Sequence, residues 1–244
     1  MRCELGKAGE RVAQEPVNVW ERPERGARGP AAVHSRAQLT AVAVGLADRS
    51  GLPAVSMRQV AKELGAGQSS LYRYISGRED LLDLMADAVT GEVDLDVPLS
   101  APVEDLLALA VRTKAVHLLH PWLAEIPPEP LRLGPRSLDY LEYALRAMAP
   151  TRLLGGTRME IVALMSALIA QFARVELRGS RANSDRQAAQ VAYLGKTASQ
   201  GDHPHIAAAL ADRAGSDPAE DSQALFEQTM RRVLTGLVLP RSSR

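Results

Sequence analysis

The chain has 244 residues, 46% of them hydrophobic and 24% charged, which is long enough to bury a core without external staples. Its single cysteine, Cys3, excludes an intramolecular disulfide and fits a reducing compartment. No apolar run reaches the ~18 to 20 residues that a membrane span needs, and the first residues lack the apolar stretch of a secretory signal. We therefore expect a soluble, cytoplasmic protein that has no membrane partner.

The formal net charge is zero, but the charges are unevenly distributed along the chain. Residues 31–75 carry five basic and two acidic side chains, whereas residues 76–244 have a net charge of −4. A basic part before an acidic remainder is compatible with nucleic-acid binding, although a solvated charged face is the commoner reason for a small excess.

Residues 1–34 contain three prolines and show no sustained apolar period, which predicts a disordered amino-terminal arm. The arginines of its ERPERGARGP stretch are placed to reach DNA, but a plain flexible tail explains them as well. Beyond the arm, apolar residues recur at helical spacing and no run alternates as strands do. We expect an all-α protein with a first domain over residues 35–80 and a larger one over residues 81–240.

Capping signals and apolar spacing predict four amino-terminal helices, over residues 35–51, 56–65, 68–75 and from 76 to about 89. Ser35 is expected to cap the first helix while Gln38 reaches back, and Ser76 with Glu79 is expected to form the same capping box. The later helices are expected over about 100–120, 134–149, 156–178, two within 186–213, and 218–238.

The stretch from Ser56 to Ile75 is typical of a helix-turn-helix. Two short helices are joined by a glycine-containing turn, with small residues where the helices must approach closely. The second helix begins with the polar run Gln68, Ser69 and Ser70, at the turn where a recognition helix enters the major groove. An ordinary helical hairpin with a solvated face would show the same features.

The run SMRQVAKELGAGQSSLYRYISGREDLL, within residues 34–89, resembles the amino-terminal DNA-binding domain of the TetR/AcrR family. The resemblance implies that bases are read by Arg58, Gln68 and Ser69. It assigns phosphate contacts to Ser56, Ser70, Tyr72, Tyr74 and Arg78.

The sequence departs from the pattern of this family at three positions. Arg73 stands where the family often has histidine or another aromatic residue, so it is either a base reader or a phosphate clamp. Arg78 replaces the more usual lysine but keeps its charge. Gly67 stands where Ser, Thr or an acidic residue is frequent.

The segment HLLHPWLAEIPPEPLRLGPRSLDYLEYALRAM has a looser resemblance to the ligand-binding and dimerisation domain of tetracycline-repressor-like proteins. Aromatic, histidine and methionine side chains there suit a bulky, largely apolar effector. The candidate pocket residues are His117, His120, Trp122, Tyr140, Tyr143, Met148, Met165 and Phe172. Each of them also fits an ordinary core position.

The long helix near 156–178 and the last helix carry more apolar surface than one core requires, which favours a symmetric four-helix contact between two copies. The candidate interface residues are Ile161, Leu164, Leu168, Phe226, Met230, Val233 and Leu237. Ordinary core burial is the alternative. Arg174 and Glu176 are either polar pocket groups or an interface pair.

These features favour a DNA-binding transcriptional regulator, most simply a homodimeric repressor released from a palindromic operator by a small molecule. The alternative is a small-molecule-binding protein, or an enzyme, built on the carboxy-terminal domain without sequence-specific DNA binding. No nucleotide-binding loop or nucleophile elbow is present, so neither an enzyme nor a cofactor is expected. No metal is expected either, because the histidine pairs at 117/120 and 203/205 lack a third ligand.

Overall fold

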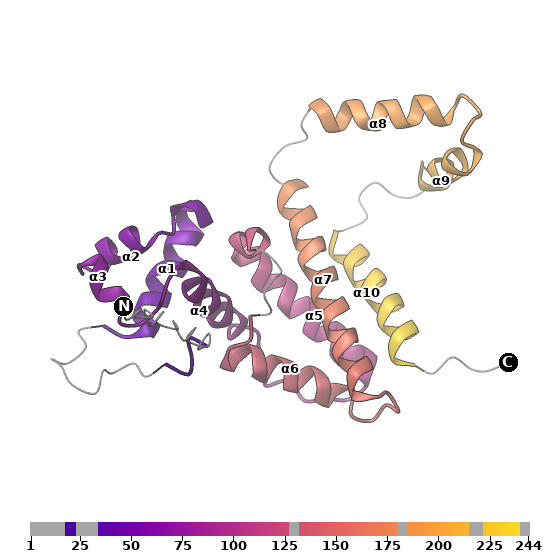
Figure 1. Cartoon of the computed structure of the whole chain (residues 1–244). Helices are drawn as coiled ribbons and strands as arrows, with labels where there is room; N and C mark the ends of the chain where they lie inside the picture. The colour runs from indigo at the N-terminus through magenta and orange to yellow at the C-terminus, as the bar shows by residue number, and fades with distance from the viewer. Residues whose placement is uncertain (1–17, 23–33, 127–131, 180–184, 215–221, 240–244) are drawn as a thin grey trace, which may run out of the picture.

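The computed structural model describes residues 18–22, 34–126, 132–179, 185–214 and 222–239. These residues form ten α-helices and two short 3-10 helices without a strand among them (Figure 1), so the all-α prediction is confirmed. None of these helices combines the length and the apolar character that a membrane span requires.

The amino-terminal domain consists of α1 (Arg36–Ser50), η1 (Leu52–Ala54), α2 (Met57–Glu63), α3 (Gln68–Leu71) and α4 (Arg78–Thr90). α1 is capped as predicted. The Ser35 hydroxyl accepts the Gln38 N–H at 3.1 Å, and the Gln38 side chain accepts the Ser35 N–H at 2.9 Å. Gly51 ends the helix with a φ of 76°, which favours glycine.

The third predicted helix is shorter than expected. Regular helical structure in α3 ends at Leu71, and residues 72–74 continue as a turn. The Ile75 N–H still donates to the Leu71 carbonyl at 3.2 Å, so the chain keeps its helical direction beyond the end of α3.

The capping box predicted at the start of the fourth helix is wrong. The N-cap of α4 is Gly77, and no side chain bonds to the helix at that cap. The Ser76 N–H instead donates at 2.6 Å to the carboxylate of Asp80, which lies one residue further along than Glu79.

The body of the protein consists of α5 (Pro102–Leu119), η2 (Pro121–Glu125), α6 (Pro135–Ala147), α7 (Gly155–Gly179), α8 (Asp185–Ala198), α9 (Pro204–Ala214) and α10 (Ser222–Val238). α5, α7 and α10 pack side by side around buried side chains such as Leu109, Ile169 and Met230. α8 and α9 pack against each other and stand away from this bundle (Figure 1).

α4 connects the amino-terminal domain with the body through its acidic side chains. Asp87 accepts hydrogen bonds from the Ser137 N–H and hydroxyl, both at 2.8 Å, and from the Arg136 N–H at 3.3 Å. These N–H groups belong to the first turn of α6, which has no side-chain cap of its own. A carboxylate from α4 therefore satisfies the positive end of the α6 dipole.

A second connection joins α1 to η2 through His120, which lies between two carboxylates. Its Nδ1 is 2.7 Å from Asp48 and its Nε2 is 3.0 Å from Glu92, while Trp122 Nε1 donates to Asp48 at 2.7 Å. Burial lowers the pKa of His120, but the bonds to Glu92 and Asp48 outweigh it and raise the pKa above its ordinary value. Burial, with the charge of His120, lowers the pKa of His117 to about 4.

The structure differs from the expected disordered arm at residues 18–22. These residues form a turn in which Val19 is 1% exposed and packs into the core. Burial of this valine, with Trp20 packed beside it, gives the segment an apolar anchor that its proline-rich surroundings did not indicate. Residues 1–17 and 23–33 lie outside the described residues.

The two histidines predict opposite effects of pH on stability. Because the folded pKa of His120 is raised, its contribution to the free energy of unfolding is complete below ~6.5 and is lost as the pH rises through the folded pKa. Because the folded pKa of His117 is lowered, its contribution to the free energy of unfolding is lost as the pH falls from ~6.5 towards 4. Denaturant titrations between pH 6 and 9 should give free energies of unfolding for wild type and His120→Gln that converge at high pH.

At pH 6 the His120→Gln variant should be less stable by about 1.5 to 3 kcal/mol, since it loses charged hydrogen bonds. His203→Gln, which changes an exposed histidine, is the matched control and should follow the wild-type curve throughout. A constant difference between His120→Gln and wild type across this pH range would contradict the assigned ion pairs.

Candidate nucleic-acid interface

α2 and α3 form a helix-turn-helix whose inner face is apolar. Ser56 caps α2 by accepting the Gln59 N–H at 3.2 Å, and Val60, Ala61 and Leu71 are buried between the helices. The Ala66 N–H donates to the Ala61 carbonyl at 2.9 Å, so the chain closes back on the end of α2.

Gly65 makes the turn between the two helices possible. Its φ of 65° lies in the left-handed region, which glycine adopts without steric cost. After this turn α3 lies at the edge of the molecule, on the side away from α5, α7 and α10 (Figure 1).

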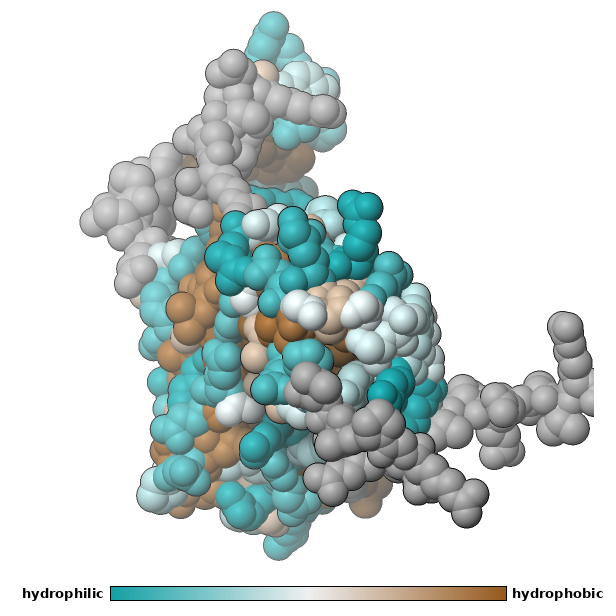
Figure 2. Space-filling view, turned by 90° about the vertical axis from the view of Figure 1, so that its left-hand side faces the viewer, coloured by the Kyte–Doolittle hydropathy of each residue, from teal (hydrophilic) through white to brown (hydrophobic). Residues whose placement is uncertain are grey.

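The outward face of this motif is polar and basic. Arg58 and Lys62 on α2, with Gln68 at the start of α3, line a shallow cleft of about 420 Å³. Ser69 and Arg73 are also exposed, each on the same motif. On the face of the molecule that carries this domain, hydrophilic residues cover most of the surface (Figure 2).

The charge of this face is not neutralised within the protein. No carboxylate in the part of the chain that the structure describes pairs with Arg58, Lys62 or Arg73. The three cations are therefore available to a negatively charged partner.

Five of the nine predicted DNA-binding residues have exposed side chains that make no described hydrogen bond: Arg58, Gln68, Ser69, Tyr72 and Arg73. Tyr72 is 53% exposed, which is high for an aromatic residue. These five lie together on α2, α3 and the turn that follows.

The other four predicted residues have roles inside the domain. Ser56 is the cap of α2, and the Ser70 hydroxyl donates to the Gly67 carbonyl at 2.6 Å. The Tyr74 side chain is only 5% exposed, and the Tyr74 carbonyl accepts Arg36 Nε at 3.1 Å. This burial leaves little of the Tyr74 side chain for a phosphate.

The guanidinium of Arg78 also binds within the domain. It donates to the Val55 carbonyl and, at 3.4 Å, to the Leu52 carbonyl. Arg78 therefore links the start of α4 to the connection between α1 and α2, a role that the sequence gave no means to see.

The eight predicted pocket residues do not surround one of the cavities found among the described residues. His120 and Trp122 lie at the junction with α1, and the Tyr140 hydroxyl is 3.2 Å from the Thr113 hydroxyl. The Tyr143 hydroxyl donates to the Val97 carbonyl at 3.0 Å. The remaining four are Met148 and Met165, which are buried, and His117 and Phe172, which are half-buried.

A buried polar cluster lies near these residues and was not predicted. Lys114 is 1% exposed, and its Nζ lies 2.7 Å from a Glu176 carboxylate oxygen and 2.8 Å from Gln223 Oε1. The same Nζ lies 5.1 Å from the centre of the Phe226 ring, which packs edge-on against Phe172. The sequence feature that could have indicated this cluster is the lysine within the apolar run of α5.

Arg174 and Glu176 both have partners within their own chain. Arg174 donates to the Ala124 carbonyl in η2 at 3.1 Å, and Glu176 pairs with Lys114. The two side chains therefore bind separate groups of their own chain rather than each other.

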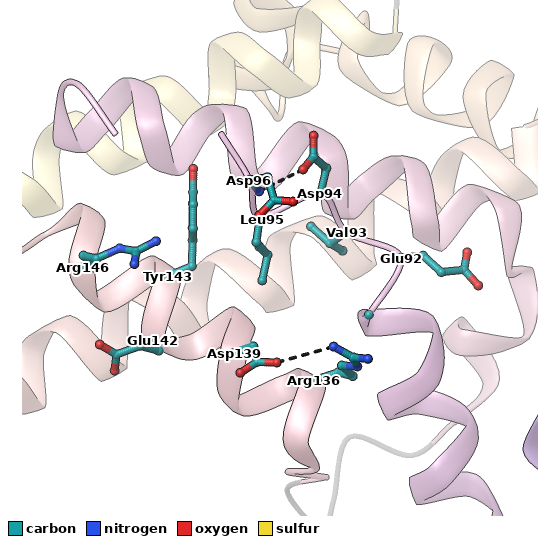
Figure 3. Close-up of a pocket in the computed structure, with 11 residues that line it drawn as sticks. Glu92, Val93, Asp94, Leu95, Asp96, Arg136, Asp139, Glu142, Tyr143 and Arg146 are labelled. Carbon is teal, nitrogen blue, oxygen red and sulfur yellow. Dashed lines mark hydrogen bonds and ion pairs between the residues drawn. The ribbon is translucent and has the colours of Figure 1, made fainter. Parts of the chain in front are cut away.

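A second cavity, of about 520 Å³, lies between α6 and the chain that links α4 to α5 (Figure 3). Its charged lining residues are Glu92, Asp94, Asp96, Arg136, Asp139, Glu142 and Arg146. Arg136 and Asp139 form an exposed ion pair at 3.9 Å. This charged lining does not suit the largely apolar effector that the sequence predicted.

The predicted interface residues divide into two groups. Ile161, Phe226 and Met230 are buried in the core of their own chain, so for these three the alternative of ordinary core burial is correct. Leu164 and Leu237 are exposed, Leu168 and Val233 are half-buried, and all four keep apolar surface on α7 and α10.

Two family models match the chain: bacterial regulatory proteins of the tetR family over residues 39–85, and the tetracyclin repressor-like C-terminal domain over residues 102–239. The HTH-type transcriptional repressor DrrR1 of Streptomyces coeruleorubidus is 32% identical over 93% of this chain and 85% of its own length. An HTH-type transcriptional regulator of Saccharopolyspora erythraea is 30% identical over 91% of this chain and 92% of its own.

The solved structure of apo ActR from Streptomyces coelicolor covers 87% of this chain and 97% of its own, with a TM-score of 0.71 and 25% identity. ActR has also been solved in complex with (S)-DNPA and with actinorhodin. The family matches, the relatives and the exposed basic helix-turn-helix agree, and the chain belongs to the TetR family of DNA-binding transcriptional regulators.

Proposed function

We propose that the protein is a homodimeric repressor that binds a palindromic operator through α2 and α3 and is released by a small molecule. The observation that carries this proposal is the exposed, unneutralised basic face of the helix-turn-helix. The same face disfavours the alternative of a small-molecule-binding protein or enzyme without DNA binding.

Base reading is assigned to Arg58, Gln68 and Ser69. Arg58 and Gln68 line the same cleft from two helices, so they reach adjacent positions in one major groove. Arginine binds guanine bidentately and glutamine binds adenine, which supports a sequence-reading role for this pair. Tyr72 and Arg73 are exposed at the end of the recognition helix and are assigned to phosphates or to neighbouring bases.

The dimer is supported by apolar side chains that one chain leaves exposed. On α8 and α9 these are Val191, Tyr193, Leu194 and Ile206, and on α7 and α10 they include Leu164, Val175 and Leu225. A second copy related by a two-fold axis would cover both sets. The two recognition helices of such a dimer would enter successive major grooves about 34 to 36 Å apart.

The effector is assigned to the bundle of α5, α7 and α10. ActR, whose (S)-DNPA complex covers 86% of this chain at a TM-score of 0.70 and 26% identity, supports a small-molecule response in a protein of the same fold. In this bundle Phe172 packs edge-on against Phe226, and Lys114 pairs with Gln223 beside them, so aromatic and polar groups lie together in its interior. This combination suits a largely apolar ligand with few polar groups.

Replacement of Arg58 tests the base-reading assignment. Arg58→Ala should weaken binding to the preferred operator by about 1 to 3 kcal/mol and relax selectivity at one base pair. Fluorescence anisotropy with the DNA upstream of the gene, and with single-base variants of it, measures both effects. Arg152→Ala removes the same charge from an exposed loop of the body and should leave both unchanged. Unaltered selectivity in Arg58→Ala would refute the assignment.

Replacement of Arg78 separates a structural role from a phosphate contact. Because its guanidinium binds two backbone carbonyls, Arg78→Ala should lower the free energy of unfolding by about 1 to 3 kcal/mol. The salt dependence of DNA binding should stay as in wild type. If stability were unchanged and the salt slope fell by about one, the phosphate contact implied by the family pattern would be correct instead.

Sedimentation tests the dimer. The wild-type protein should sediment as a dimer at micromolar concentration, and Val191→Asp with Tyr193→Asp should shift it towards monomer, because two carboxylates would be buried unpaired. Leu154→Asp places a single carboxylate at an exposed leucine before α7 and should leave the dimer intact. A monomeric wild type would contradict the proposal.

A further inference from the structure

We propose that residues 18–22 form an intramolecular clasp that fixes the position of the DNA-binding domain against α6, with Trp20 and Arg22 as positioning residues for operator binding. The inference rests on the proposed function, because it concerns the operator affinity of the helix-turn-helix. The segment lies before both regions that the family models match, residues 39–85 and 102–239.

The clasp is anchored by burial and by its own turn. Val19 is almost completely buried, and Trp20 packs against the same core. The Glu21 N–H donates to the Asn18 carbonyl at 3.1 Å, and the Trp20 N–H donates to Asn18 Oδ1 at 3.1 Å. These bonds fold the segment into a turn in which Trp20 and Arg22 have different partners, Gly134 for the indole and Asp80 for the guanidinium.

On the body side, Trp20 lies directly against Gly134, the N-cap of α6. A Cβ atom at Gly134 would overlap both the indole of Trp20 and the carboxylate of Asp87. The glycine therefore allows α4, α6 and the clasp to meet at one point. Asp87 is the side chain that caps α6, so the indole packs beside the main polar link between the two domains.

On the side of the DNA-binding domain, a single side chain, Asp80, links Arg22 to the residues that follow α3. Arg22 Nη1 pairs with Asp80 at 3.0 Å, and Asp80 accepts the Ser76 N–H. The Arg22 carbonyl accepts Arg36 Nη2 at 2.5 Å, and Arg36 Nε donates to the Tyr74 carbonyl. Two separate routes thus lead from Arg22 to the residues that follow α3.

A cavity next to the clasp gives the junction room to move. Its volume is about 650 Å³, and it lies between α1 and α4 with Trp20, Asp48 and His120 in its lining. α1 and α4 pack on each other through the core, and beside this cavity the polar links and the clasp add to that contact. Loss of the indole enlarges the cavity and frees the DNA-binding domain to change its angle to α6.

The test compares operator DNA with a random duplex of equal length. Trp20→Ala should weaken operator binding roughly fivefold or more, because binding must then select one of several domain positions. Binding to the random duplex should stay unchanged, since it needs no fixed spacing. Trp20→Phe keeps an aromatic ring against Gly134 and should restore most of the affinity.

A glycine pair supplies a matched control. Gly134→Ala should weaken operator binding at least as much as Trp20→Ala does, because its Cβ displaces both the indole and Asp87, and the double variant should be no weaker than Gly134→Ala alone. Gly156→Ala, at a position where a Cβ meets nothing, should bind as wild type does. Equal operator affinity in Trp20→Ala and wild type, or a parallel loss on both duplexes, would overturn the clasp.

Amide hydrogen exchange of the free protein tests the clasp without DNA. Trp20→Ala should speed exchange of the Ser137 and Ser76 N–H groups, which Asp87 and Asp80 hold, relative to wild type. Unchanged exchange at both groups would refute the clasp. If the wild type bound no operator but exchange accelerated as expected, the proposed function would fail and the clasp would stand.

Discussion

Asp80, Asp83 and Asp87 follow one another along one face of α4, and each carboxylate binds a different segment of the chain. Asp80 binds Arg22 and the Ser76 N–H, Asp83 binds Arg132, and Asp87 binds the first turn of α6. Residues spaced by three and four lie on one helix face, so a single helix gathers these segments. The position of the helix-turn-helix relative to the body depends on this face.

The placement of these groups explains how a signal in the body would reach DNA. η2 contacts α7, because Arg174 donates to the Ala124 carbonyl. η2 also contacts α1, because Trp122 donates to Asp48. α6 joins the body to α4 through Asp87. A ligand that shifts α7 or α6 therefore acts on α1 and α4 together, and the recognition helix moves with them because the domain is closely packed.

Local patterns made much of the fold predictable from the sequence. Ser35 with Gln38, and Ser56 before an apolar face, mark helix starts through bonds between near neighbours, and the structure contains both caps. The polar start of α3 at Gln68 followed from the sequence pattern, whereas the role expected of Arg58 came from the resemblance to the TetR/AcrR family. Ser76 misled because its N–H had two acidic side chains within reach, and spacing alone does not decide between them.

The remaining features depend on contacts that are distant in the sequence. Asp87 caps a helix 50 residues away, Arg78 binds carbonyls more than 20 residues before it, and Val19 is buried by helices that begin after residue 35. The apolar character of Phe226 indicated burial but not whether its own chain or a second copy would cover it. No periodicity encodes the partner of such a residue.

The distance between the DNA-binding domains of a dimer tests the role of α4 most directly. Spin labels at Glu63→Cys, an exposed position on α2, in a Cys3→Ser background report that distance by pulsed electron resonance. The wild-type junction should give one narrow distribution, and Asp87→Ala should broaden it, because the link between α4 and α6 is lost. An equally narrow distribution at the same distance in Asp87→Ala would contradict the account.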